Sequence, residues 1–267
     1  MQLRRNKIRF SKINHIFISH IHGDHIFGLY GLLSTFSLLG RKNPLYLYAP
    51  ENYGAILKAH LSDFDIHLSY EIEFVPLRGK NPVLILDDRY ITVRAFPLLH
   101  RIPAYGFLFT EKSGERKIIK EAITEHNIPV SRIPSIKNGA DFTREDGVVI
   151  RNGEITLPPH SAYSYAYCSD TRYFKRLSTF IKDVTLLYHE ATFETDKQKL
   201  ALITGHSTSA DAANVAREAG ARALIIGHLS SRYKDTDKLV KEARSIFGPT
   251  FAAEEGKTYD LSEIDSL

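Results

Sequence analysis

The sequence predicts an α/β fold, in which sheets are covered by helices. Apolar runs of strand length recur through its 267 residues, and segments of helical period lie between them. The strands cluster early in the chain and later alternate with helices, an order typical of sheet layers packed against helices. No repeat or linker-like stretch divides the chain, so we expect a single domain over residues 1–267.

The expected strands are runs rich in β-branched and aromatic residues. They cover residues 15–19, 45–50, 72–77, 83–88, 90–99, 104–110, 164–170, 184–191 and 223–228. Residues 26–40 are apolar on nearly every side, which is typical of a helix buried on several faces. Residues 209–221 and 234–248 are amphipathic segments that end at or beside a glycine, and we expect both to be helical.

Residues 111–160 differ from the rest of the chain. They are polar, contain four prolines and mix charges with few periodic runs, which indicates a protruding insertion. An ordinary variable surface loop is the alternative, although structureless loops beyond about 15 residues are usually functional or disordered.

The composition bounds the class of protein. The net charge of +4 permits a polyanionic partner without requiring one. Cys168 is the only cysteine, which excludes an intrachain disulfide and a cysteine-rich zinc module and suits a reducing cytoplasm. No apolar stretch approaches the roughly 20 residues that span a bilayer, so we expect a cytoplasmic protein with no membrane partner.

The segment "SHIHGDH", residues 19–25, places four potential metal ligands at the end of an expected strand. Alternate side chains of an extended segment share a face, so His20 and His22 can hold one ion. Gly23 permits a tight turn that would bring Asp24 and His25 to the start of the next helix, aimed at a second point. The motif therefore predicts two adjacent metals held by imidazole and carboxylate, a donor set that favours a catalytic site.

Two metals need further ligands from other strand ends. His100, Asp170 and His228 each follow an apolar strand, where a fold can bring loop residues to one edge of a sheet. Asp170 can bridge two ions through its two oxygens.

These motifs resemble the metallo-β-lactamase superfamily and, within it, the ribonuclease Z family. The resemblance extends over "DHIFGLYGLLSTFSLLGR", "LLHRIPAYGFLF", "SDTRY", "LLYHEATF", "GHSTSADAANVAREAGA" and "LIIGHLSSRY". It implies a four-layer αββα sandwich with a protruding arm, and an endoribonuclease that removes the 3′ trailer from precursor tRNA. Water activated by the metals would attack the phosphodiester and leave a 3′ hydroxyl on the tRNA.

The resemblance also implies roles for individual residues. His20, His22 and His100 would hold one Zn²⁺, and Asp24, His25 and His228 a second, with Asp170 bridging them. The same ligands would serve Mn²⁺ or Co²⁺. Asp24 would also accept a proton, and Glu190 with His206 would relay protons near the leaving group. A buried ion pair or a helix-capping network is the alternative interpretation of Glu190 and His206.

Two parts of the sequence are candidates for contact with the RNA substrate. Ser230, Ser231 and Arg232 follow a metal ligand and could clamp the scissile phosphate, although a plain surface turn is the alternative. The insertion at 111–160 corresponds to the arm that holds the tRNA elbow, usually of the partner subunit's substrate, so we expect a homodimer. The Gly/Pro-rich element of that arm appears here as "NIPVSRIP", without its glycine.

A second departure concerns the start of the chain. Members of the family place strands and a "DCGEGTQ"-like motif before the segment that begins here at Met1. We therefore expect the first N-terminal strands to be lacking and one sheet edge to be exposed.

Two alternative functions remain open. One is a phosphodiesterase of the same fold that acts on small or cyclic phosphodiesters. The other is a catalytically compromised RNA-binding module.

Overall fold

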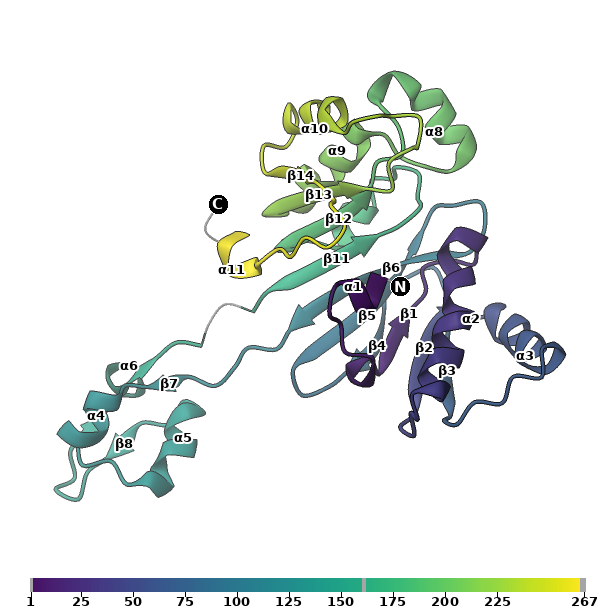
Figure 1. Ribbon diagram of the computed structural model, residues 1–267. Coiled ribbons are helices and arrows are strands. Elements are labelled where there is room, and N and C mark those ends of the chain that lie inside the picture. The colour runs from purple at the N-terminus through teal and green to yellow at the C-terminus, as the bar shows by residue number, and fades with distance from the viewer. Residues whose placement is uncertain (1, 160–161, 265–267) are drawn as a thin grey trace. The chain divides into compact units, whose positions relative to one another are not determined.

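The computed structural model describes residues 2–159 and 162–264 (Figure 1). They form two compact units. Unit 1 consists of the described residues within Met1–Asp88, Thr92–Phe109 and Ser164–Leu267, and unit 2 of those within Arg89–Ile91 and Thr110–Tyr163. The predicted insertion at 111–160 falls within unit 2.

Unit 1 contains two sheets. The smaller sheet is parallel and has the order β1 (His15–Phe17), β2 (Leu45–Pro50), β3 (Ile72–Leu77). The larger sheet has seven strands. Its order is β14 (Thr250–Ala252), β13 (Ala223–Gly227), β12 (Leu186–Glu190), β11 (Ser164–Cys168), β6 (Ala104–Glu111), β5 (Ile91–Leu98) and β4 (Val83–Asp87).

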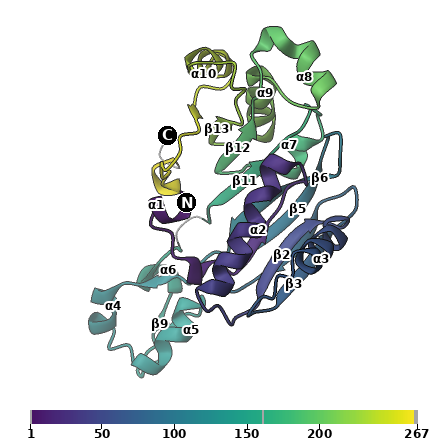
Figure 2. The ribbon, with the colours of Figure 1, turned by 45° about the vertical axis from the view of Figure 1, so that its right-hand side comes forward.

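Helices pack against each sheet (Figure 2). α2 (Gly23–Leu38) and α3 (Tyr53–Asp63) share a core with the small sheet, built around Leu33, Phe36 and Leu47. α7 (Leu177–Phe180), α9 (Ser209–Ala219) and α10 (Asp237–Arg244) share a second core with the large sheet. The remaining helical segments of unit 1 are α1 (Gln2–Arg5), η1 (Phe10–Lys12), η3 (Thr195–Lys197), α8 (Gln198–Thr204) and α11 (Leu261–Ile264).

The two sheets face each other through aromatic side chains. The ring of Phe17 on β1 lies 5.3 Å from the rings of both Phe107 and Phe109 on β6. Each sheet therefore has helices on one face and the other sheet on the opposite face. This order confirms the predicted α/β class and the four-layer αββα arrangement.

Unit 2 has a small core of its own. Its short elements are β7 (Lys117–Ile118), α4 (Lys120–Glu125), η2 (Val130–Arg132), α5 (Ile133–Lys137), β8 (Phe142–Thr143), β9 (Val149–Ile150), α6 (Asn152–Ile155) and β10 (Thr156–Leu157). Ile136, Phe142 and Ile155 are buried together, and the Asn152 side chain donates to the carbonyl oxygens of Ile136 and Ala140 at 2.7 and 2.8 Å. The sequence predicted no regular element in this stretch, because runs this short carry little periodicity.

The main elements of unit 1 lie where the sequence predicts them, with differences at the edges. The predicted first strand is shorter, ending at Phe17, and the Ser19 carbonyl accepts instead from Tyr105 N at 2.8 Å. The helix predicted at residues 26–40 is α2, which begins earlier, at Gly23, and ends at Leu38. Between residues 2 and 14 the structure describes no strand before β1, which lies at the edge of its sheet. No helix among the described residues has the length and apolarity to cross a membrane.

Candidate metal centre

Seven potential ligands in unit 1 gather at the ends of its strands. His20 and His22 lie in the extended segment after β1, and Asp24 and His25 lie in the first turn of α2. The other three follow the strands of the large sheet: His100 after β5, Asp170 after β11 and His228 after β13. β11, β12 and β13 are parallel neighbours, so their carboxyl ends meet at one edge.

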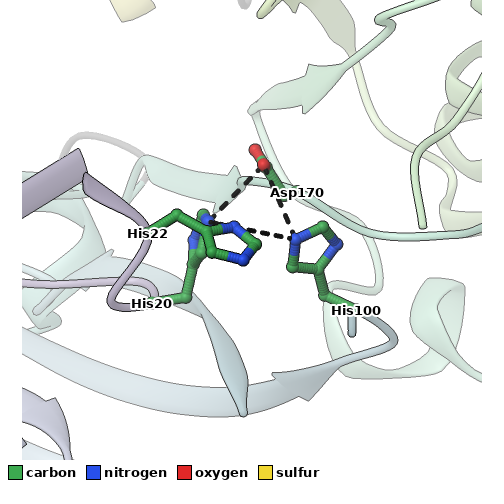
Figure 3. Close-up of side chains that lie close together, drawn as sticks. All are labelled: His20, His22, His100 and Asp170. Atoms are coloured by element: carbon green, nitrogen blue, oxygen red, sulfur yellow. Dashed lines mark hydrogen bonds and ion pairs between the residues drawn. The ribbon is translucent and has the colours of Figure 1, made fainter. Parts of the chain in front are cut away.

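One set of ligands is centred on three imidazoles. His20 Nε2 lies 3.1 Å from His22 Nδ1, which lies 3.2 Å from His100 Nε2. Figure 3 shows these rings with Asp170, whose Oδ2 lies 3.5 Å from His20 Nε2 and 3.9 Å from His100 Nε2. The ligand atoms of these four residues all lie within 4.8 Å of one another.

A second set adjoins the first through the same carboxylate. Asp24, His25 and His228 bring their ligand atoms within 4.8 Å of one another. Asp170 Oδ1 lies 3.6 Å from His25 Nε2 and 3.4 Å from His228 Nε2. The two oxygens of Asp170 thus face different sets, which is the geometry of a bridging carboxylate. Asp170 is also within reach of His206 and His228 as a third group.

Hydrogen bonds orient several of these imidazoles. His100 Nδ1 lies 2.8 Å from the carbonyl oxygen of Gly205, so this nitrogen must carry the proton and donate it. The lone pair of His100 then resides on Nε2, which faces the cluster. His20 Nδ1 lies 3.1 Å from the hydroxyl of Ser19, and His228 Nδ1 lies 2.9 Å from the hydroxyl of Thr192. Such outer contacts fix the ring orientation of metal-bound histidines.

The backbone at the site is specialised. Gly205 has φ +84°, and a Cβ there would lie 2.9 Å from His100 Nδ1. His228 has φ +56°, a conformation that non-glycine residues rarely adopt and that is often found at functional sites. Gly23 starts α2 directly after its N-cap His22 without a positive φ, and His25 N donates to the His22 carbonyl at 3.0 Å. The chain therefore turns here and brings Asp24 and His25 to the start of the helix, as expected.

Burial controls the charges of the ligands. Desolvation lowers the pKa values of His22, His25 and His100, so these imidazoles are neutral at neutral pH and can donate lone pairs. Burial alone would raise the pKa of Asp170, but contacts with His20 and His228 outweigh it and hold that pKa well below its usual range. Asp170 is therefore an anion at the centre of the cluster.

The donor set fits a metal ion. Neutral imidazole nitrogens that converge within 3.2 Å repel one another unless a proton or a cation lies among them. Within the described part of the chain, His25 Nε2 is buried without a hydrogen-bond partner, and ligation would satisfy it. Imidazole and carboxylate are ligands that Zn²⁺ and other transition metals accept.

A hydrogen-bonded group lies beside the cluster at the end of β12. Glu190 Oε1 accepts from His206 Nδ1 and from Thr171 N, each at 2.9 Å. Glu190 Oε2 accepts from the hydroxyl of Thr192 at 2.7 Å. Burial would lower the pKa of His206, but the Glu190 carboxylate outweighs it and raises that pKa. His206 therefore holds its proton to higher pH than an ordinary histidine.

The predicted phosphate clamp lies on the loop that follows His228. Ser230 N donates to the Thr192 carbonyl at 3.2 Å, which ties this loop to the site. Arg232 Nε donates to the Ser230 hydroxyl at 2.9 Å, and its guanidinium lies 5.0 Å from the ring centre of Phe193. Ser231 and Arg232 are exposed.

Sequence reasoning missed the residues that support the ligands. The Thr192 hydroxyl contacts His228, and the Gly205 carbonyl contacts His100. Thr171 N donates to Glu190, and the Ser207 hydroxyl donates to the Thr171 carbonyl. The capping box of α9, formed by Thr208 and Asp211, holds the start of that helix just after His206. Its Thr-x-x-Asp spacing was a readable signal, whereas the other contacts depend on how the loops meet.

Comparisons with known proteins identify the relatives of this chain. The chain is 47% identical to ribonuclease Z of Bacteroides thetaiotaomicron over 255 residues, which cover 96% of this chain and 81% of that protein. It is 44% identical to ribonuclease Z of Porphyromonas gingivalis over 97% of this chain and 86% of that protein. A family model described as anti-Pycsar protein Apyc1 matches residues 1–112.

Solved structures show the same fold. The short form of human tRNase Z matches with a TM-score of 0.66 at 23% identity, over 97% of this chain and 83% of that one. The metallo-β-lactamase fold protein YhfI from Bacillus subtilis matches with a TM-score of 0.60 at 19% identity, over 93% and 78% of the two chains. This chain therefore has the metallo-β-lactamase fold and belongs to the ribonuclease Z family.

Proposed function

We propose that this chain is a metal-dependent endoribonuclease that removes the 3′ trailer from precursor tRNA and leaves a 3′ hydroxyl on the tRNA. The observation that carries the proposal is the convergence of seven His and Asp ligands beside the Glu190–His206 pair. Membership of the ribonuclease Z family supports the same substrate and reaction.

We further propose two Zn²⁺ ions per subunit. His20, His22 and His100 would hold one, Asp24, His25 and His228 the other, and Asp170 would bridge them. This division of the ligands is supported by Asp170, whose Oδ2 faces His20 and whose Oδ1 faces His228. When bound, the ions supply Lewis-acid charge and lower the pKa of water toward neutrality.

The protein's own groups would manage protons and position the phosphate. Asp24, whose side chain is 72% exposed, would accept a proton and pass it to solvent. His206, protonated through its contact with Glu190, would donate a proton to the leaving oxygen. Ser230, Ser231 and Arg232 would contact the scissile phosphate, because they follow His228 directly.

The segment 111–160 would hold the tRNA elbow by shape and phosphate contacts rather than by reading bases. Exposed cations such as Lys117, Lys120 and Arg132 suit phosphate contacts. The described part of this segment folds around its own core, so the proposed RNA contacts can be preorganised even without the glycine of the usual arm element.

We also propose a homodimer and a cytoplasmic location. Phe27 and Leu38 of α2 are 72% and 87% exposed, and Leu39 follows them, which favours burial against a second copy. The single, buried Cys168 suits a reducing compartment.

A comparison of substrates tests the function. The proposal predicts that the zinc-loaded protein cleaves a precursor tRNA with a kcat/KM far above that for bis(p-nitrophenyl) phosphate or a cyclic nucleotide. Similar or better turnover of the small phosphodiesters would favour the alternative phosphodiesterase. RNA binding by the zinc-loaded protein without any cleavage would favour the RNA-binding module.

A further inference from the structure

The start of the chain is strongly basic, and the reaction described above does not use it. Up to residue 50 the sequence has one acid, Asp24, which lies in the metal centre. The bases in this stretch are Arg4, Arg5, Lys7, Arg9, Lys12, Arg41 and Lys42, here called the N-terminal basic surface. All seven are exposed except Arg41, which is half-buried. The guanidinium groups of Arg4 and Arg41 lie over the rings of Phe10 and Phe36.

The positive charge of this surface is not neutralised within the described residues. No ion pair in residues 2–159 and 162–264 joins these seven side chains to an acid. Arg41 donates to neutral oxygens: the carbonyls of Ile13, Asn43 and Pro44, and the amide of Asn14. Arg41 therefore ties the end of α2 to β1 and β2 and still contributes its full charge to the surface.

The surface is hollowed in two places along α2. A hollow of about 490 Å³ is lined by the cations Arg9, Arg41 and Lys42 and by the apolar side chains Phe10, Phe36 and Leu39, among others. A second hollow, of about 620 Å³, lies between α1 and α2 and is lined by Arg4, Gly28 and Gly31 among others. A Cβ at Gly28 or Gly31 would meet nothing within 4 Å, so another molecule's backbone can approach the helix closely there.

α2 connects this surface to the metal centre. Asp24 lies in its first turn, and Arg41 and Lys42 follow its last residue, Leu38. In Figure 2 the N-terminal segment lies beside this helix. At 1.5 Å per residue, the helix places its last residue, Leu38, about 21 Å from Asp24. A helical nucleic-acid strand that advances about 3.4 Å per nucleotide covers this distance in about six nucleotides.

We propose that the N-terminal basic surface binds backbone phosphates of the RNA substrate, up to about six nucleotides from the scissile bond. The inference rests on the proposed function and adds an RNA contact within unit 1 to the one proposed for the segment 111–160. Leu39, which we assign above to subunit contact, also lines the first hollow, so the phosphate contacts would lie beside that interface. The cations, which make no ion pair within the described residues, favour a polyanion there.

The test compares two double variants of the full chain. Arg9→Gln/Lys42→Gln removes two charges from the proposed surface. The control, Lys58→Gln/Lys80→Gln, removes two charges elsewhere in unit 1. Both lysines are exposed, the first on α3 and the second on the turn between β3 and β4. For each we would measure the Kd of a precursor tRNA between 50 and 200 mM salt, hydrolysis of bis(p-nitrophenyl) phosphate, and the sedimentation coefficient.

For the first variant we expect an affinity loss of about tenfold and a salt slope smaller by about 2, since each phosphate contact contributes about 0.9. Hydrolysis of the small substrate, which cannot span the helix, should equal that of the control. Equal tRNA affinity and equal salt slope in the two variants would overturn the inference. A change in the sedimentation coefficient alone would also overturn it and would assign the surface to subunit contact. Failure of the unmodified protein to cleave precursor tRNA would overturn the proposed function separately, because Kd and the salt slope still report on the surface.

Discussion

His100 Nδ1 donates a 2.8 Å hydrogen bond to the carbonyl oxygen of Gly205. The bond joins the loop after β5 to the end of α8, two parts of the chain more than a hundred residues apart. It leaves His100 Nε2 as the atom that faces the other ligands, so the backbone of Gly205 acts as an outer support of the metal centre.

Gly205→Ala should therefore weaken metal binding. Alanine in the left-handed region costs about 1 kcal/mol, and its Cβ would lie 2.9 Å from the His100 ring and displace it. We expect metal affinity to fall about tenfold or more in a competition titration with a chromophoric chelator. Gly79→Ala is the matched control, since Gly79 has φ +90° but open space around it. Equal metal affinity in the two variants would contradict this role.

Thr192→Val should weaken metal binding through His228. The Thr192 hydroxyl donates to Glu190 and accepts from His228 Nδ1, which directs the His228 Nε2 lone pair toward the cluster. Valine has the same shape without the hydroxyl, so we expect metal affinity to fall about 10- to 100-fold while the fold is retained. Thr192→Ser should restore most of the affinity. If serine and valine bind metal equally well, the hydroxyl does not position His228.

Glu190→Gln should change the pH dependence of cleavage. The Glu190 carboxylate raises the pKa of His206 against the effect of burial, so its removal lowers that pKa. If protonated His206 donates to the leaving group, kcat falls as pH rises through its pKa, and the alkaline limb of the profile should move to lower pH in the variant. The pH profile of the cleavage rate constant, measured under single-turnover conditions, reports the position of this limb directly. An unmoved alkaline limb would show that the pair is structural.

Asp24→Asn should affect turnover far more than RNA binding. The change removes the carboxylate that we propose as a metal ligand and proton acceptor but leaves the shape of the site. We expect kcat on precursor tRNA to fall by two or more orders of magnitude, with Kd changed less than about threefold. Asp65→Asn, at another exposed aspartate of unit 1, should leave both unchanged. A comparable loss of tRNA affinity in Asp24→Asn would show that this residue shapes the RNA surface instead.

The potential ligands of the centre were readable from the sequence because most of them directly follow an apolar strand, and the other two open the next helix. "SHIHGDH" places four potential ligands within seven residues, and His100, Asp170 and His228 follow the apolar runs of β5, β11 and β13. Strand ends converge at a sheet edge, so local sequence was sufficient to predict a shared site.

The supporting residues were not readable in this way. Thr192 and Gly205 act through hydrogen bonds to ligands that lie 36 and 105 residues away in the sequence. Such contacts depend on how the loops pack, which no local pattern reports. The small core of unit 2 was missed for a related reason, since its apolar residues come singly from several short elements.

The central claim is that this cluster makes the chain a metal-dependent nuclease of precursor tRNA. The most direct test maps the ends of the products from one precursor tRNA, with the protein untreated, stripped by a chelator, and reloaded with Zn²⁺. We predict one cut at the 3′ side of the discriminator base with a 3′ hydroxyl, lost on stripping and restored on reloading. Cleavage that survives complete metal removal, or a cut elsewhere in the RNA, would contradict the account.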